Sequence, residues 1–221
     1  MAVKCCYVSY KDYSGVIDRR RVGDIDAFGS ETMSRDERTA WIERTLRVSR
    51  EDAERYGDSI NYFTSDYESI HDGTDTYNNE QINRAIENKN APVYSGMQWR
   101  GLHLDIENMP AGVTPRQFIE KIIRGGVWKE NGATSFSASR AIAEHTFADI
   151  DHWQNGPNRV PVVIRYQGRT GMPIKHMSDF THEDEVLHSQ KQMKRGYDIV
   201  DHHWEKNNTV VYITIADKRR K

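Results

Sequence analysis

The chain has 221 residues, which fits one domain of ordinary to large size or a smaller domain with an N-terminal extension. Charged residues make up 29% and hydrophobic residues 37%, and the formal net charge is −2, so the composition argues against a membrane protein, a disordered chain and a general nucleic-acid binder. The two cysteines, Cys5 and Cys6, are adjacent and predict no disulfide framework. The N-terminus lacks the apolar stretch of a signal peptide, so we expect an intracellular protein.

The first half of the chain is predicted to be helical. Residues 1–33 mix turn-forming residues with a basic run and show no clear period. Ser34 and Glu37 have the spacing of a capping box, and the apolar residues that follow recur at helical intervals. A second helix is expected to begin near residue 49, and helices dominate to about residue 56. A further helix is expected around residues 82–86.

The second half alternates short apolar runs with turns, which predicts the strands of one sheet system. Two helices interrupt these strands, one opened by Thr114-Pro115 and closed by Gly125-Gly126, the other over residues 139–147. The whole pattern indicates an α+β fold. The expected strands are residues 91–94, 134–137, 160–166, 185–187, 197–200 and 210–215.

An acidic triplet in the C-terminal third is the first candidate site. If Glu183-Asp184-Glu185 belongs to a strand that continues into the following Val and Leu, alternation places Glu183 and Glu185 on one face, about 7 Å apart, and turns Asp184 away. Two carboxylates facing one space repel each other unless a cation, a sugar hydroxyl or water lies between them, so the pair could stabilise positive charge during a reaction. Taken alone, such a triplet is more often a solvated strand face.

Two further segments carry side chains suited to a phosphate- or sugar-bearing ligand. Arg100, at a strand end, offers a guanidinium fork for phosphate oxygens, and Gly101 allows a ligand to approach the backbone closely. Alternation places Ser135 and Ser137 on one face of a strand, where their hydroxyls could orient a carboxylate or a ribose. Ser139 lies at the expected N-cap of the next helix. Each feature is common by itself.

The histidines and cysteines match no metal or nucleophile pattern. The nine histidines have no ligand spacing of the kind found on one helix face, and neither cysteine lies in a nucleophile motif. Glycine-rich loops of the P-loop or dinucleotide-binding kind are absent from the sequence. We therefore expect no metal site.

The order of the three candidate segments is more informative than any one of them. Arg-Gly, then Ser-x-Ser leading into a helix, then Glu-x-Glu-Val-Leu resembles the arginine-type mono-ADP-ribosyltransferases, whose signature is Arg, Ser-Thr-Ser and Glu-x-Glu in this order. The resemblance covers about residues 60–215. Within the family, the chain looks most like the small bacteriophage enzymes that modify host proteins, with bacterial toxins next. It implies an ADP-ribosyltransferase-like fold: an N-terminal helical layer packed on a split, mainly antiparallel β-sheet that encloses an NAD cleft. It also implies a helical extension over residues 1–57 and a catalytic domain over residues 58–221.

The sequence departs from the family pattern at two places. Phe136 replaces the central Thr of the Ser motif, which is tolerable if its side chain points into the core. Residues 93–96, Val-Tyr-Ser-Gly, resemble the family's Tyr-Arg-Gly with Ser in place of Arg, so only Arg100 has the required chemistry.

The resemblance implies a role for each matched residue. Arg100 would bind a phosphate of NAD, with the Gly101 backbone near the nicotinamide amide. Ser135 would hold the catalytic glutamate and the nicotinamide ribose. Glu185 would accept a hydrogen bond from the ribose 2′-hydroxyl and stabilise the oxocarbenium-like transition state. Glu183 would orient and deprotonate the acceptor, by default an arginine.

Four more side chains are assigned to the same cleft. Ser137 and Phe147 are expected to contribute to NAD binding, and Trp153 is expected either to cover the nicotinamide and exclude water or to act as a hydrophobic anchor. Residues 175–182 would form the acceptor-recognition loop, with Phe180 exposed towards the target protein.

Four functions remain open on the sequence. Arginine ADP-ribosylation of host proteins in the host cytoplasm is the leading one, with NAD as substrate and a monomeric enzyme that contacts no membrane. NAD glycohydrolysis would use the same cleft, with water as the acceptor. A non-enzymatic binding or virion-associated module would keep the fold without the reaction. RNA as acceptor is encouraged slightly by the basic C-terminal tail.

Overall fold

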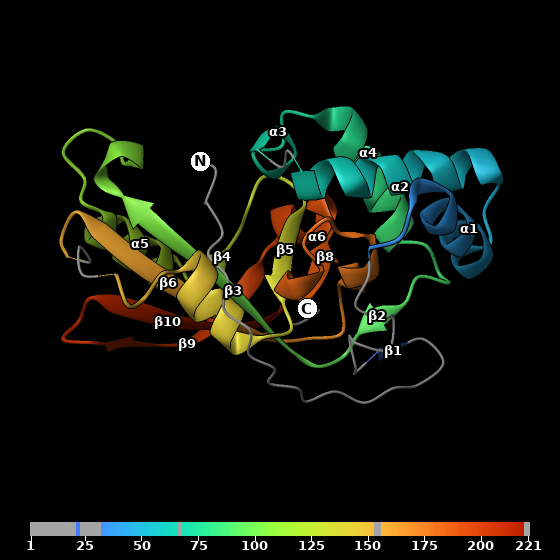
Figure 1. The fold of residues 1–221 in the computed structure, drawn as a ribbon. Helices are drawn as coiled ribbons and strands as arrows, with labels where there is room; N and C mark the ends of the chain where they lie inside the picture. The colour runs from blue at the N-terminus through green and yellow to red at the C-terminus, as the bar shows by residue number, and fades with distance from the viewer. Residues whose placement is uncertain (1–20, 23–31, 66–67, 153–155, 219–221) are drawn as a thin grey trace.

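The computed structural model describes residues 21–22, 32–65, 68–152 and 156–218. Helices α1, α2, α3 and α4 gather at one end of the molecule, beside β5 and β8, and α5 lies at the other end (Figure 1). The α-helices are α1 (Arg35–Leu46), α2 (Arg50–Ser65), α3 (Glu68–His71), α4 (Thr76–Ile86), α5 (Pro115–Gly125) and α6 (Gln190–Arg195). Shorter 3-10 turns are η2 (Ile106–Asn108), η4 (Lys175–Met177) and η5 (Thr181–Glu183), and η3 (Ile142–Phe147) is a π-helix.

The described strands form a large mixed sheet and a small parallel pair. They are β1 (Arg21–Val22), β2 (Val93–Tyr94), β3 (Met97–Asp105), β4 (Val127–Trp128), β5 (Thr134–Ser137), β6 (Arg159–Gln167), β7 (Met172–Pro173), β8 (Glu185–His188), β9 (Tyr197–Glu205) and β10 (Val210–Asp217). The order in the large sheet is β4-β9-β10-β6-β3-β5-β8-β7, and β1 pairs with β2. Within the described part of the large sheet only β6 and β10 run parallel, so the expected α+β fold with a mainly antiparallel sheet is confirmed.

The large sheet is split between β3 and β5. Along β3, the pairing with β6 is continuous from Met97 to Asp105. Its pairing with β5, in contrast, consists of the pair Trp99 and Ser137. Beyond this pair the two strands separate, and the sheet divides into the halves β4-β9-β10-β6-β3 and β5-β8-β7.

The helical layer forms where local sequence signals predict it. Ser34 Oγ accepts a hydrogen bond from the Glu37 backbone N–H, and the Glu37 carboxylate accepts one from the Ser34 N–H at 2.9 Å, which completes the capping box at the start of α1. Arg47, at φ 56°, ends the helix in the left-handed conformation. The α5 helix is similarly opened by a Thr114 capping box and closed by Gly126 at φ 69°.

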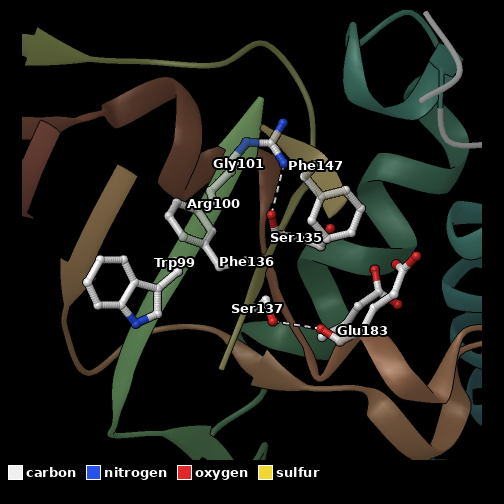
Figure 2. A pocket seen from close by; sticks show the side chains of 9 residues that line it. Trp99, Arg100, Gly101, Ser135, Phe136, Ser137, Phe147 and Glu183 are labelled. Carbon is white, nitrogen blue, oxygen red and sulfur yellow. Dashed lines mark hydrogen bonds between the residues drawn. The ribbon is translucent and has the colours of Figure 1, made fainter. Parts of the chain in front are cut away.

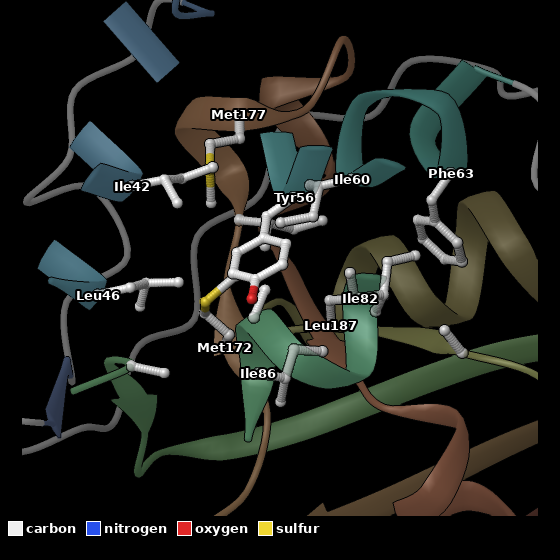
Figure 3. Packing of buried hydrophobic residues seen from close by; sticks show 14 of the residues in the cluster. Ile42, Leu46, Tyr56, Ile60, Phe63, Ile82, Ile86, Met172, Met177 and Leu187 are labelled. Carbon is white, nitrogen blue, oxygen red and sulfur yellow. The ribbon is translucent and has the colours of Figure 1, made fainter. Parts of the chain in front are cut away.

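The helices α1 to α4 share one core with β7, η4 and β8 (Figure 3). Apolar side chains from α1, α2 and α4 pack on residues of β7, η4 and β8, among them Ile42, Leu46, Tyr56, Ile60, Ile82, Met172, Met177 and Leu187. The expected boundary between residues 57 and 58 falls inside α2, a continuous helix, with core residues on both sides of it. No helix in the described part of the chain combines the length and the apolar character needed to cross a membrane.

Candidate active site

A small pocket opens where the two halves of the sheet separate (Figure 2). The pocket is partly open to solvent. The residues that line it come from β3, β5, η3, η5 and β8: Trp99, Arg100, Gly101, Ser135, Phe136, Ser137, Phe147, Glu183 and Glu185. Thus the Arg, Ser-x-Ser and Glu-x-Glu segments lie together at one site.

Arg100 lies in the middle of β3, which corrects the prediction that it ends a strand. Its Nη1 donates a hydrogen bond of 2.9 Å to the carbonyl oxygen of Ser135, across the split between β3 and β5. The guanidinium therefore bridges two strands beyond the point where backbone pairing stops. Residues 93–96, the competing segment, do not line the pocket, and Val93–Tyr94 pair with β1 instead.

Gly101 is required by packing against η3. A Cβ atom at this position would lie 1.8 Å from the carbonyl oxygen of Ala143 and 2.6 Å from the backbone nitrogen of Ala148. The Ala148 N–H donates to that same Ala143 carbonyl at 2.9 Å, five residues back, which is the π-helical bond. The sequence pattern explained Gly101 by the approach of a ligand, but the stronger constraint is the π-turn packed on β3.

The Ser-Phe-Ser segment behaves as alternation predicts. Phe136 is 2% exposed and its ring packs in the core against Tyr166 and His188, so the departure from the family's Thr is accommodated by the core. Ser137 Oγ donates to the Glu183 carbonyl oxygen at 2.7 Å and accepts from the Ser139 N–H at 3.0 Å. The Ser137 hydroxyl thereby holds the turn that carries Glu183.

The expected strand over residues 185–187 is confirmed, but it does not include Glu183 and Asp184, so the condition for alternation across the acidic triplet is not met. Glu183 ends the 3-10 turn η5, Asp184 has a left-handed backbone with φ 51°, and the strand β8 begins only at Glu185. Both glutamates nevertheless line the pocket, because the turn at Asp184 brings Glu183 back towards it. Strand alternation is therefore not the reason why they share one space.

A buried ion pair fixes the turn between the two glutamates. The Lys175 ammonium donates to Asp184 Oδ1 at 2.7 Å, and the two side chains are only 7% and 6% exposed. The backbone of the turn is also held, since Ala138 N–H donates to the Asp184 carbonyl and Ile174 N–H to the Glu185 carbonyl. Asp184 therefore has a positioning role that an alternating strand does not give it.

Glu185 is the electrostatically unusual group of the site. Burial and the nearby Glu183 carboxylate raise the pKa of Glu185 to about 8, and hydrogen bonds with the Ser178 and Ser135 side chains oppose this only in part. Among the described residues, Glu185 Oε2 is buried without a hydrogen-bond partner. A carboxyl group of this kind is suited to receive a hydroxyl donor or a positive charge.

The remaining predicted residues are distributed around this pocket. Phe147, the last residue of η3, lines it. Phe180 is 38% exposed and precedes η5, outside the pocket lining, with its ring edge-on to His182. Trp153 lies outside the described residues. Within the described part of the chain, no cluster of His, Cys, Asp and Glu has the makings of a metal site.

Sequence reasoning missed three groups that act on the site. Trp99 lines the pocket directly before Arg100; it belongs to the same Trp-Arg-Gly segment, but no role was predicted for its side chain. Ser178 contacts Glu185, and Glu130 contacts Arg100 at 3.0 Å. Glu130 lies in a polar Lys-Glu-Asn-Gly turn, so nothing local in the sequence distinguishes it from a solvated residue.

No family model matches the sequence, and no curated protein matches it. Solved structures do match the fold. An ADP-ribosyltransferase from Clostridium botulinum is 14% identical, with a TM-score of 0.54 over 94% of this chain and 99% of that one. The ADP-ribosyltransferase HopU1 of Pseudomonas syringae pv. Tomato DC3000 is 11% identical, with a TM-score of 0.53 over 87% and 94% of the two chains. Exoenzyme S from Pseudomonas aeruginosa, in complex with human 14-3-3 protein beta and bound to carba-NAD, is 10% identical, with a TM-score of 0.52 over 87% and 86%.

The chain has the ADP-ribosyltransferase fold. These matches extend over nearly the full length of the compared chains, so the helical layer and the split sheet both belong to the shared architecture. The fold predicted from the order of the Arg, Ser-x-Ser and Glu-x-Glu segments is confirmed. Within the ADP-ribosyltransferase fold of this chain, the three segments meet at the split between β3 and β5.

Proposed function

We propose that the chain is an NAD-dependent mono-ADP-ribosyltransferase that transfers ADP-ribose to an arginine of a target protein. The observation that carries the proposal is the buried Glu185 carboxyl, whose Oε2 lacks a partner among the described residues, in one pocket with Arg100, Ser135 and Glu183. The fold supports it, since the matched Clostridium botulinum protein and HopU1 are ADP-ribosyltransferases and exoenzyme S was solved with carba-NAD. Host proteins, met in the host cytoplasm, are the proposed targets.

NAD cleavage is assigned to Glu185. The Oε2 atom accepts a hydrogen bond from a hydroxyl of the nicotinamide ribose, and the carboxylate stabilises the positive charge that develops on the ribose as the C1′–N bond to nicotinamide breaks. The electron pair of that bond leaves with neutral nicotinamide. Ser135, which contacts Glu185, keeps the carboxylate aimed at the ribose.

The raised pKa of Glu185 fits a site that becomes charged only with its substrate. Burial favours the protonated form of Glu185 in the free protein. The nicotinamide ring of NAD carries a positive charge. This charge offsets the free-energy cost of ionising the buried Glu185 carboxyl and so favours its carboxylate form. The Glu185 carboxylate therefore forms when NAD is bound, and the charge of NAD stabilises it in place of water.

Acceptor activation is assigned to Glu183. Glu183 lines the same pocket and is only 5% exposed, so a guanidinium that pairs with its carboxylate is largely desolvated. The guanidinium nitrogen forms the new bond to C1′ as the acceptor loses one proton to Glu183. Phe180, an exposed aromatic residue three positions before Glu183, offers an apolar contact to the target protein.

The test uses NAD labelled in its adenylate half, the purified protein and a cell lysate. We expect label on proteins, transfer to poly-arginine in preference to poly-lysine, and a loss of about 10²- to 10³-fold in the Glu185→Gln variant. Glu107→Gln, the same change at an exposed glutamate of η2, is the matched control.

Each alternative function has its own outcome. Free ADP-ribose without labelled protein would indicate a glycohydrolase, and label in the RNA fraction would indicate an RNA acceptor. No consumption of NAD at all would indicate a binding module. Transfer that persists in Glu185→Gln would remove Glu185 from the mechanism.

A further inference from the structure

Arg100 is not a free cation in this structure. Its Nη2 donates to Glu130 Oε2 at 3.0 Å, and the two side chains are 15% and 10% exposed. The charges of the pair cancel, so a phosphate that approaches Arg100 meets a guanidinium already neutralised by the protein. A ligand anion has to compete with Glu130 for the same donor.

Glu130 has enough other partners to release Arg100. Trp128 Nε1 donates to Glu130 Oε1 at 2.9 Å, and Thr134 Oγ1 donates to Oε2 at 3.2 Å. Burial opposes ionisation of Glu130, but Arg100, His71 and these hydrogen bonds outweigh it and hold the pKa of Glu130 below its usual range. Glu130 therefore stays a carboxylate whose charge has to be balanced.

His71 is the group of this cluster that can supply the balancing charge. Its Nε2 lies 3.3 Å from Glu130 Oε2 and 3.4 Å from Arg100 Nη2, so it already stands beside both members of the ion pair. Burial and the Arg100 charge lower the pKa of His71, and Glu130 acts in the opposite direction. Among the described residues, Asp72 on the same segment also interacts electrostatically with His71, besides Arg100 on β3 and Glu130 before β5.

We propose that Arg100 exchanges Glu130 for the pyrophosphate of the bound dinucleotide, and that His71 takes a proton from solvent and replaces Arg100 as the counter-ion of Glu130. This inference rests on the proposed function, because it takes NAD as the ligand. In this exchange Glu130 and His71 act as positioning residues. The hydrogen bond from Arg100 Nη1 to the Ser135 carbonyl oxygen remains in place.

Charge balance is the reason for the coupled proton. Before the ligand binds, Arg100 and Glu130 contribute one cation and one anion. If Arg100 turned to a phosphate with His71 neutral, Glu130 would be left as a buried carboxylate without a cation, which is strongly unfavourable. When His71 becomes protonated, the carboxylate and the phosphate each keep a cation. Binding therefore takes up a proton and weakens as the pH rises above neutrality.

The experiment is calorimetric titration with ADP-ribose at pH 7.5 in two buffers of different ionisation enthalpy. ADP-ribose carries the pyrophosphate but not the cationic nicotinamide, whose charge would act on Glu185. We expect uptake approaching one proton in the wild type and none in His71→Gln. We also expect Glu130→Gln to bind ADP-ribose roughly tenfold more tightly without proton uptake, because Arg100 is no longer neutralised. His203→Gln is the matched control, since His203 on β9 also contacts a glutamate, Glu205, at 3.1 Å.

Proton uptake by the wild type and by His71→Gln tests the proposed exchange even if Glu130→Gln fails to fold. Equal proton uptake in the wild type and His71→Gln, or no binding of ADP-ribose by the wild type, would overturn the exchange. Weaker binding by a folded Glu130→Gln would do the same, because it would mean that Glu130 assists the anion. Label transfer from NAD is measured separately, so a protein that transfers label but takes up no proton retains the proposed function and loses this inference alone.

Discussion

Replacing Glu185 by Gln is expected to make the protein more stable while it removes the activity. Glutamine keeps the shape of the side chain and removes the charge that burial and Glu183 disfavour. The effect follows from the raised pKa of Glu185. Between the ordinary pKa of 4.5 and the raised value of about 8, the folded state holds a proton that the unfolded state has already lost. The stability of the wild type therefore falls as the pH rises through this window.

The size of the effect follows from the same shift. At about 1.36 kcal/mol for each pH unit, the fall in unfolding free energy across the window between the ordinary and the raised pKa amounts to roughly 5 kcal/mol. In a protein of this length each kcal/mol changes the melting temperature by about 2–4 °C. We expect Glu185→Gln to melt close to the wild type at pH 5 and on the order of 10 °C above it at pH 8.5.

Thermal denaturation of both proteins across pH 5–8.5 measures the difference in melting temperature, in which titrating groups that do not interact with Glu185 cancel. Glu107→Gln, at an exposed position, should follow the wild type at every pH. The melting temperature of Glu183→Gln should lie between those of the wild type and Glu185→Gln, because this variant removes only the part of the Glu185 pKa shift that the Glu183 charge causes. A gap between Glu185→Gln and the wild type that stays constant with pH would refute the reasoning.

Three further substitutions test the site. Glu183→Gln should abolish transfer to arginine yet leave NAD hydrolysis measurable; equal loss of both activities would place Glu183 in the cleavage step. Gly101→Ala should destabilise the protein by more than about 4 kcal/mol, because its Cβ would lie 1.8 Å from the Ala143 carbonyl oxygen; an unchanged melting temperature would contradict this packing. Lys175→Met should cost about 3–5 kcal/mol, because it removes the ammonium that faces the buried Asp184 carboxylate. Lys175→Met/Asp184→Leu should recover part of this loss in denaturant unfolding, whereas a double variant no more stable than the single one would show that the ion pair is not the cause.

Most helices and strands could be predicted because their signals are local, although the short helices α3 and α6 were not expected. The capping boxes of Ser34 and Thr114 lie within four residues of the helices they open, and both form as expected. Strand β3 was predicted only in part, with Arg100 at its end, because Gly101 interrupts the alternation of polar and apolar side chains along its nine residues. The widening of η3 into a π-helix depends on contact with Gly101, a residue far before it in the sequence, and no local pattern shows that.

The site could be predicted as a set of residues but not as a geometry. Arg100, Ser135 and Glu185 meet in the pocket as the motif order indicates. The left-handed turn at Asp184, in contrast, depends on Lys175, and the charge of Arg100 depends on Glu130. Both are buried pairs that join separate segments of the chain, and burial cannot be read from a polar turn or a charged triplet.

The turn at Asp184 has a consequence for how the two proposed roles, acceptor binding and bond cleavage, can diversify. Because a left-handed residue separates η5 from β8, Glu183 and Glu185 belong to different structural units, one a loop anchored by Lys175 and the other a buried strand. A new loop of different length or composition can therefore end at the same residue without changing the register of β8. In the proposed mechanism, selection for a new target acts on Glu183 while Glu185 stays fixed for bond cleavage, so that acceptor preference can change without a change in the cleavage residue.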